Sequence, residues 1–278
     1  MESSKSFAPA NISCIFKIYK HKNPRWMGSY GVGFTLDEGA IVSAEKAKRT
    51  EVVFNNVSIN FPTVKNVLNK LTKEKLRVYI KSKLPLGYGF GLSGASALAT
   101  AYSVNELLKL KKSNTELALI AHIAEVEEKT GLGDVVNQYY GGFCVKLKPS
   151  SYFIVKKLPI NNVDIYCKYF TRINTKSIIT NPKLKNKINK SATIALNKIQ
   201  ELIKNNEKIK LSSIIKISKE FAVNSRLLKD IETIKTIENI EKNNGNTSMI
   251  MLGNAVFSDK PFDKSIKLKI LDKGAYRL

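Results

Sequence analysis

Apolar and polar residues alternate most regularly in the segment LRVYIK at residues 76–81, where every second side chain is aliphatic. A period of two is typical of a β-strand with one buried face. A glycine-rich segment follows, and after it apolar residues recur at Ala97, Ala101 and Val104 with the spacing of one helix face. The pattern therefore predicts a strand, a glycine-rich loop and a helix in direct succession.

A second helix is predicted directly after the first. Ser113, followed three residues later by Glu116, forms a capping box that satisfies backbone N–H groups at a helix start. Gly131 is suited to end this helix, because glycine readily adopts the left-handed conformation found after helix C-termini. A short helical turn is expected over residues 135–140. Alternation over residues 143–148 predicts another strand.

The second half of the chain shows a weaker pattern. It predicts strands at residues 152–155, 163–169 and 266–271, helices at residues 191–205 and 212–228, and an apolar segment at residues 249–257. Strands and helices that are mixed without strict alternation favour an α+β fold. The polar turn at residues 149–151 suggests a boundary between two domains, residues 1–155 and residues 156–278.

The composition bears on possible partners. The 278 residues carry a net charge of +23, which suits either nucleic-acid binding or the attraction of anionic substrates. The lysines are spread from Lys17 to Lys273 without a compact cluster of arginine and aromatic residues, so we expect no nucleic-acid partner. Three isolated cysteines and two histidines argue against a disulfide framework or a zinc site.

The expected location of the protein is the cytoplasm. The first residues, MESSKSFAPA, lack the cationic start and apolar stretch of a signal peptide. No apolar run reaches the roughly 18–20 residues that a membrane-spanning helix needs, so no membrane partner is expected.

The segment PLGYGFGLSGAS, which begins at Pro85, carries the clearest functional signal. Glycines let the main chain approach a phosphate closely, and a following helix N-terminus presents N–H groups and a partial positive charge. The P-loop pattern does not fit, because no lysine follows the glycines. Gly89, Gly91 and Gly94 match the dinucleotide pattern GxGxxG, but two successive helices follow instead of a helix and a strand. A phosphate site is therefore predicted, with a tight structural turn as the alternative.

Four segments together resemble the GHMP kinase superfamily of small-molecule kinases. PLGYGFGLSGASAL resembles the phosphate loop of that family, and APANI at residues 8–12 resembles its N-terminal motif. TGLGD at residues 130–134, followed by Gly141-Gly142, and GNTSM at residues 245–249 stand in the order and spacing of the other motifs. The variants GYGFGLSGA, HIAEVEEKTGLGD and SMIMLGNAVF are most similar to those of archaeal pantoate kinases.

The resemblance implies a two-lobed fold with the nucleotide in the cleft between the lobes. It also implies ATP and Mg²⁺ as cofactors and phosphorylation of the primary hydroxyl of pantoate to 4-phosphopantoate, a step of coenzyme A biosynthesis. Mevalonate or homoserine stays open as the acceptor, because one sequence does not define the acceptor pocket. The second lobe is expected to close over the site with the turn at residues 245–249, and a homodimer is expected by analogy.

The resemblance also assigns residues to the phosphates and to catalysis. The phosphate-binding residues are Pro85, Gly87, Gly89, Gly91, Leu92, Ser93, Gly94, Ala95 and Ser96. Asp134 is the expected catalytic carboxylate, which would orient or deprotonate the acceptor hydroxyl.

Two residues are expected to hold the metal ion. Glu125 is the expected carboxylate ligand, with Glu127 as the alternative. The usual Ser-Ser pair of the family falls on Gly94 and Ala95 here. We therefore expect Ser96 to supply the hydroxyl ligand, with Ser93 as the alternative.

The acceptor side is expected in the run GSYGVG, through Ser29 and Gly31. Pantoate carries a carboxylate, which calls for a cation or a nest of N–H groups in its pocket. Arg25, Arg172 and Lys17 are the candidates. The family often has a lysine where Asn11 stands, so an electrostatic helper for the reaction must come from elsewhere in the chain.

Overall fold

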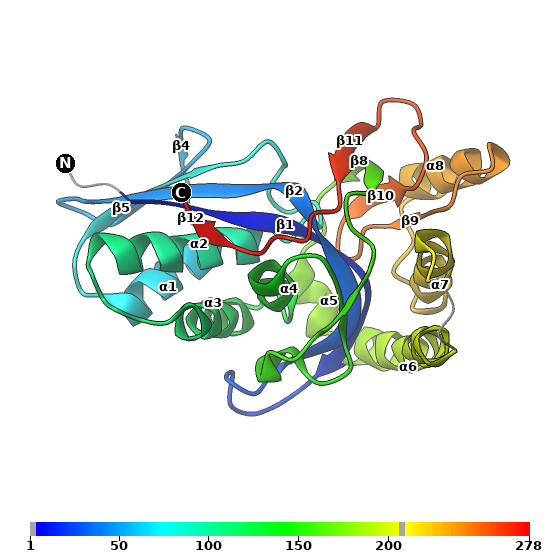
Figure 1. Cartoon of the computed structure of the whole chain (residues 1–278), viewed down its shortest axis with the longest axis horizontal. Coiled ribbons are helices and arrows are strands. Elements are labelled where there is room, and N and C mark those ends of the chain that lie inside the picture. Colours follow the sequence, from blue (N-terminus) through cyan, green and yellow to red (C-terminus); the bar gives the residue numbers. More distant parts are fainter. Residues whose placement is uncertain (1–3, 206–208) are drawn as a thin grey trace.

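The structure is a computed structural model that describes residues 4–205 and 209–278, and it has two lobes that share a pair of long strands. β1 (Ser4–Tyr19) and β2 (Gly28–Lys46) form an antiparallel hairpin that runs through the first lobe and reaches the second (Figure 1). Both strands are buried on both faces over most of their length. They therefore lack the alternation that marks a half-buried strand.

The first sheet is built around this hairpin. Its other strands are β3 (Glu51–Phe54), β4 (Val57–Ser58), β5 (Leu76–Lys81), β6 (Phe143–Lys146), β7 (Lys156–Leu158) and β12 (Tyr276–Arg277). The order is β12-β1-β2-β5-β3-β4, and β3 runs parallel to β5. β2 pairs with β5 through residues 41–46 and with β6 through residues 31–34, so its two ends belong to two branches of the sheet.

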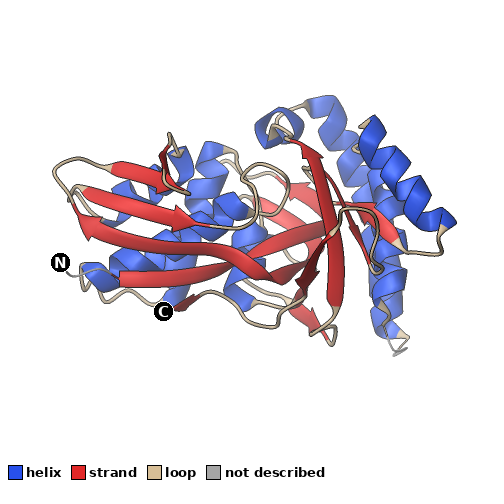
Figure 2. Cartoon of the chain, turned by 90° about the horizontal axis from the view of Figure 1, so that it is seen from above, coloured by secondary structure: helices blue, strands red, loops and turns tan. Residues whose placement is uncertain are grey.

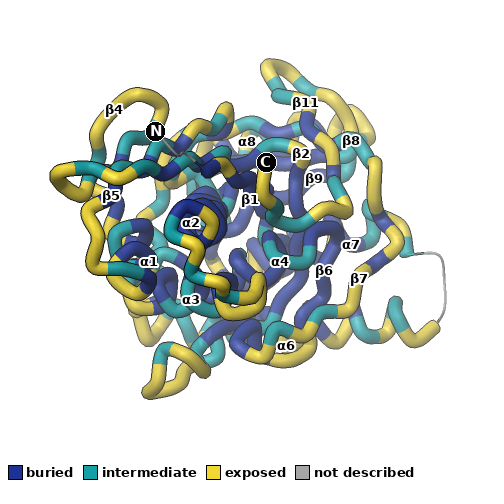
Figure 3. Tube along the Cα trace, turned by 60° about the vertical axis from the view of Figure 1, so that its left-hand side comes forward, coloured by how far each residue is buried: buried dark blue, intermediate teal, exposed yellow. Residues whose placement is uncertain are grey.

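Helices cover one face of this sheet (Figure 1). They are α1 (Pro62–Leu71), α2 (Leu92–Leu107), α3 (Asn114–Glu128) and α4 (Asp134–Tyr140). α2 packs on β1 and β2 with one side and on α1 and α3 with the other, and Figure 3 shows it buried at the centre. Its alanines allow these close approaches. The helix whose N-terminus carries the glycine-rich loop is thus fixed inside the core.

The second lobe combines a smaller sheet with helices on its outside (Figure 2). Its elements are β8 (Asp164–Thr171), α5 (Thr175–Ile179), α6 (Pro182–Lys204), α7 (Leu211–Asn224), α8 (Ile231–Lys242), β9 (Thr247–Met249), β10 (Asn254–Ser258) and β11 (Ile266–Lys269). The strand order is β11-β8-β10-β9, with α7 and α8 packed on β9 and α6 packed on β1. After β11 the chain returns to the first lobe, where β12 pairs with β1.

The α+β class is confirmed, as are the strand at residues 76–81 and the capping box of Ser113 and Glu116. The strand expected at residues 152–155 is wrong, because a 3₁₀ turn (Ser150–Tyr152) precedes β7 there. α3 ends at Glu128 with Lys129 in the left-handed conformation (φ 59°), not at Gly131.

Two further observations bear on the organisation of the chain. The division at residue 155 stays a prediction, and β7 and β12, which follow that residue, both belong to the first sheet. Within residues 4–205 and 209–278, no helix combines the length and the apolar character that crossing a membrane requires.

Candidate active site

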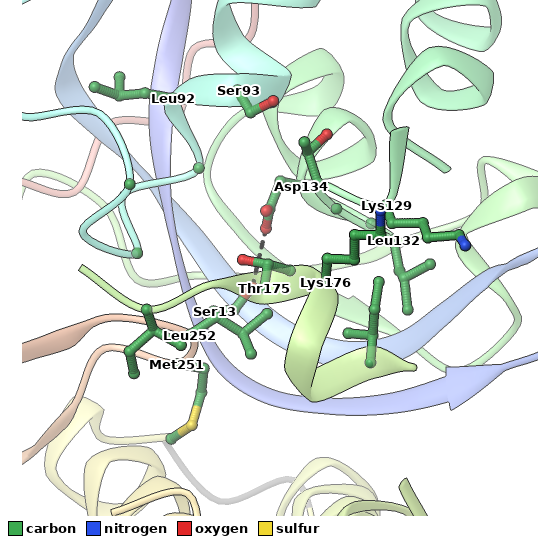
Figure 4. A pocket seen from close by; sticks show the side chains of 18 of the residues that line it. Ser13, Leu92, Ser93, Lys129, Leu132, Asp134, Thr175, Lys176, Met251 and Leu252 are labelled. Atoms are coloured by element: carbon green, nitrogen blue, oxygen red, sulfur yellow. Dashed lines mark hydrogen bonds between the residues drawn. The ribbon is translucent and has the colours of Figure 1, made fainter. Parts of the chain in front are cut away.

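A cavity of about 430 Å³ lies where the glycine-rich loop, the loop before α4 and the second lobe meet. Figure 4 shows Ser93 and Asp134 of the first lobe and Thr175 and Met251 of the second around the same space. The prediction that a turn at residues 245–249 closes the site is wrong. Those residues lead into and form β9, and it is the following turn, with Met251 and Leu252, that lines the cavity.

The glycine-rich loop has the backbone conformation that its composition requires. Gly87, Gly89 and Gly91 have φ values of 92°, 90° and 62°, in the region that side-chain-bearing residues rarely adopt. Gly91 is the N-cap of α2, so the first free N–H groups of that helix face the loop. The loop also packs against the second lobe, because a Cβ on Gly253 would lie 2.1 Å from the Tyr88 carbonyl oxygen.

The predicted phosphate-binding residues fall into two groups. Gly87, Gly89, Gly91, Leu92 and Ser93 line the cavity. Pro85, Gly94, Ala95 and Ser96 are not among its lining residues. The loop and the helix start therefore bring backbone N–H groups to the cavity, an arrangement that suits an anion.

Asp134 is the first residue of α4 and faces the cavity. Its Oδ1 accepts hydrogen bonds from Asn11 Nδ2 at 2.7 Å and from Ser13 Oγ at 3.1 Å, the second of which is drawn in Figure 4. Burial raises the pKa of Asp134, while the charge of Lys146 and these two hydrogen bonds oppose that rise. Both hydrogen bonds end on Oδ1, so Oδ2 is the oxygen available to a bound molecule.

Lys146 of β6 is a residue that the sequence analysis missed. It is buried and lines the cavity, and its Nζ donates to Gly133 O at 3.1 Å and to Asn137 Oδ1 at 2.9 Å. Burial lowers the pKa of Lys146, and the charge of Asp134 opposes this. Two of its three N–H donors are thus engaged, and one remains for a ligand.

Glu125 of α3 is buried, with 1% of its surface exposed. Its Oε1 accepts from Thr130 Oγ1 at 3.3 Å, whereas Oε2 has no hydrogen-bond partner among the residues that the structure describes. The carboxylate fills the space above two glycines, because a Cβ on Gly131 or Gly94 would lie 2.5 Å or 2.9 Å from Oε2. Burial and the charge of Asp134 raise the pKa of Glu125 to about 8.

The alternative carboxylate, Glu127, lies on the surface. It forms an ion pair with Lys70 at 2.8 Å and accepts a hydrogen bond from Asn66 at 3.1 Å. A buried carboxylate oxygen that lacks a partner fits a bound cation better than an exposed ion pair does. The site therefore fits a metal ion at Glu125 and not at Glu127.

The two candidate serines are placed differently. Ser93 lines the cavity, and its Oγ donates to Thr63 Oγ1 at 3.2 Å. It also lies close enough to Glu125 to lower the pKa of that carboxyl. Ser96 is fully buried one turn further along α2 and is absent from the cavity wall. Of the two serines, Ser93 is therefore the one that both lines the cavity and acts on the Glu125 carboxyl.

The expected cations of the acceptor side lie outside the cavity wall. Arg25 is exposed and stacks on Trp26 at 5.2 Å. Lys17 lies over Tyr30 and Arg172 over Tyr88, each 5.6 Å from the ring centre. Among the described residues, the cations that line the cavity are Lys129, Lys146 and Lys176.

Ser29 and Gly31, the two residues expected to bind the acceptor, differ in whether they line the cavity. Ser29 lines the cavity, and its side-chain oxygen lies 2.4 Å from where a Cβ on Gly133 would be. Gly31 is not part of the wall. It pairs with Phe16 in the ladder of β1 and β2, and a Cβ there would meet the Ile15 carbonyl oxygen at 2.3 Å. Gly31 therefore has a packing role in the hairpin.

Comparisons with known proteins agree with this geometry. The family described as GHMP kinases N terminal domain matches residues 60–142, which include the glycine-rich loop, Glu125 and Asp134. The pantoate kinase of Methanocaldococcus jannaschii is 36% identical over 90% of both chains. That of Methanospirillum hungatei is 31% identical over 91% of this chain and 86% of its own. A solved structure described as a phosphotransferase related to the CoA biosynthesis pathway has a TM-score of 0.84, with 25% identity and coverage of 99% and 98%.

Proposed function

We propose, from the premise that this chain belongs to the pantoate kinase family of the GHMP kinases, that it transfers the terminal phosphoryl group of ATP to the primary hydroxyl of pantoate. The product would be 4-phosphopantoate, an intermediate of coenzyme A biosynthesis. The observation that carries the proposal is Asp134, which lies in one cavity with an anion-binding glycine loop and the buried cation Lys146.

The phosphates of ATP would lie on the glycine-rich loop. The N–H groups at the start of α2, after Gly91, point at an anion there and favour negative charge. Glu125 and Ser93 would hold Mg²⁺, which when bound neutralises part of the phosphate charge. The partnerless Oε2 of Glu125 supports this assignment.

Asp134 would orient the acceptor hydroxyl and accept its proton through Oδ2. The hydrogen bonds from Asn11 and Ser13 hold Oδ1, so rotation of the carboxylate is restricted. General-base catalysis by a positioned side chain contributes typically about 10²–10⁴-fold to a rate. The positive charge of Lys146 favours the ionised form that can accept the proton.

Lys146 is the proposed partner of the pantoate carboxylate. Lys146 lines the cavity together with Asp134 and Ser29, and two of its three N–H donors are engaged within the protein. A buried ammonium group is a strong site for a carboxylate, because little water competes for it. Lys146 is proposed in place of Arg25, Arg172 and Lys17, because none of these three lines the cavity.

The test is a measurement of ADP release from Mg-ATP with pantoate, mevalonate, homoserine or no acceptor. We expect turnover with pantoate and only background ADP release with the other three. Turnover with mevalonate or homoserine instead would reject the acceptor and keep the kinase. Absence of turnover with every acceptor, together with no ATP binding by calorimetry, would reject the function itself.

A further inference from the structure

We propose that Asn137 is a positioning residue, which directs the Asp134 carboxylate through a chain of hydrogen bonds that starts at Lys146 and passes through Asn137 and Asn11. The inference rests on the proposed function in one respect, namely that Asp134 is the catalytic carboxylate. Asn137 itself is not part of the cavity wall and would not touch a substrate.

The chain consists of three consecutive contacts. Lys146 Nζ donates to Asn137 Oδ1 at 2.9 Å, and Asn137 Nδ2 donates to Asn11 Oδ1 at 2.8 Å. Asn11 Nδ2 then donates to Asp134 Oδ1 at 2.7 Å. Asn11 and Asn137 have no exposed surface, so water does not compete for these bonds.

The chemistry of the two end groups sets the direction of the chain. An ammonium group only donates hydrogen bonds, so the oxygen of the Asn137 amide must face Lys146. Its NH₂ group then faces Asn11, whose oxygen must accept. The Asn11 NH₂ group is left to face Asp134, and an ionised carboxylate only accepts. Neither amide can flip without setting like groups against each other at both of its contacts.

The chain also ties the carboxylate to the phosphate site. The backbone N–H of Asn11 donates to the Phe90 carbonyl in the glycine-rich loop at 2.9 Å. From α4, Gln138 Nε2 donates to the Gly91 carbonyl at 2.8 Å. Asp134 and the loop therefore share anchors, and a reorientation of Asn11 would disturb the alignment of donor and acceptor in phosphoryl transfer.

The test is a double-mutant cycle with Asn137→Ala, Asn11→Ala and both, read as kcat and as KM for ATP. We expect each single variant to lower kcat by about tenfold, the size of one lost hydrogen bond to a charged partner, with KM for ATP unchanged. At saturating pantoate the double variant should be no slower than Asn11→Ala, because Asn137 reaches Asp134 through Asn11. Loss of the bond between Asn137 and Lys146 should appear in KM for pantoate instead. Effects on kcat that multiply would overturn the chain.

Asn137→Asp sharpens this test. An aspartate of the same shape could pair with Lys146 but could not donate to Asn11, so the Asn11 amide would turn its oxygen toward Asp134. We expect Asn137→Asp to be slower than Asn137→Ala while unfolding at a higher temperature. The control is Asn105→Ala, which removes a buried asparagine bonded to the Lys112 backbone at the far end of α2 and should leave kcat unchanged.

A readout without catalysis separates this inference from the proposed function. The side-chain N–H protons of Asn11 should exchange slowly with solvent in ¹⁵N-labelled wild-type protein and faster in Asn137→Ala. Rapid exchange in the wild type would reject the chain. Slow exchange in a protein that phosphorylates none of the acceptors would reject the function and keep the chain.

Discussion

The regions around Asp134 and Glu125 each hold a buried carboxylate, yet they differ in hydrogen-bond donors. Asp134 lines the cavity, whereas Glu125 lies outside the wall, against Gly94 and Gly131. Asp134 receives two side-chain hydrogen bonds and has the cation Lys146 behind it. Glu125 receives one long hydrogen bond, and its second oxygen has no partner among the described residues. Asp134 thus has two hydrogen-bond donors and a cation nearby within the protein, whereas Glu125 has no positively charged partner among the described residues.

The difference separates the roles of the two groups. Two hydrogen bonds hold the Asp134 carboxylate in one orientation, and together with the charge of Lys146 they oppose the rise in its pKa that burial causes, which suits the proposed base. A buried carboxylate without a partner is costly to ionise and keeps its proton until a cation binds. The different surroundings of the two carboxylates support the proposal that Asp134 is the catalytic group and Glu125 the metal ligand.

The largest effect is expected from Asp134→Asn. The amide has the same shape but cannot accept the proton of the acceptor hydroxyl, so kcat should fall by about 10³-fold. ATP affinity measured by calorimetry and the melting temperature should stay near those of the wild type. A variant that keeps more than a tenth of the wild-type kcat would remove Asp134 from catalysis.

Lys146→Met tests the proposed contact between Lys146 and the pantoate carboxylate. Loss of one partner of a buried charge pair should lower kcat/KM for pantoate by at least about 30-fold, mainly through KM for pantoate. Lys176→Met is the matched control, because Lys176 also lines the cavity but is exposed. An exposed pair is worth up to about 1 kcal/mol, so the control should change KM by no more than about fivefold. Equal effects of the two variants would refute the assignment of Lys146.

Glu125→Gln tests the other region. Removal of the carboxylate should raise the Mg²⁺ concentration for half-maximal activity, by at least the roughly 10–100-fold that the loss of an outer-shell partner costs a metal site. At saturating Mg²⁺ much of the activity should return, which Asp134→Asn could not show. An unchanged Mg²⁺ dependence would mean that the ion binds elsewhere.

Sequence could predict those parts of the site whose conformation follows from the residue types of a short segment. Gly87, Gly89 and Gly91 had to adopt positive φ for the loop to approach a phosphate, and the structure has them so. The resemblance to the family motifs pointed to Glu125 and Asp134. In the structure Glu125 lies against Gly94 near the start of α2, and Asp134 lines the same cavity as the loop.

The parts that sequence could not predict depend on tertiary packing. β1 and β2 show no clear alternation because both of their faces are buried. Lys146 stands on the face of β6 that looked solvated, although Cys144 on the same face hinted at burial. The choice between Ser93 and Ser96 depends on the rotation of α2 about its axis, which the packing of α1, α3 and the sheet determines.

The smallest effect concerns stability against pH in the absence of metal. Burial raises the pKa of Glu125 from its ordinary value of 4.5 to about 8, so between these values the folded protein holds a proton that the unfolded chain has released. Stability must therefore fall as pH rises through that window, and it must level off above it.

Glu125→Gln lacks this proton, so its melting temperature should decline less from pH 5 to pH 8 than that of the wild type. Because the charge of Asp134 is one cause of the raised pKa of Glu125, the comparison reports on the two interacting carboxylates together. Added Mg²⁺ should flatten the wild-type curve, because the ion takes the place of the proton. Parallel curves for the two metal-free proteins would show that Glu125 is already ionised and paired, and the contrast between the two carboxylates would then be lost.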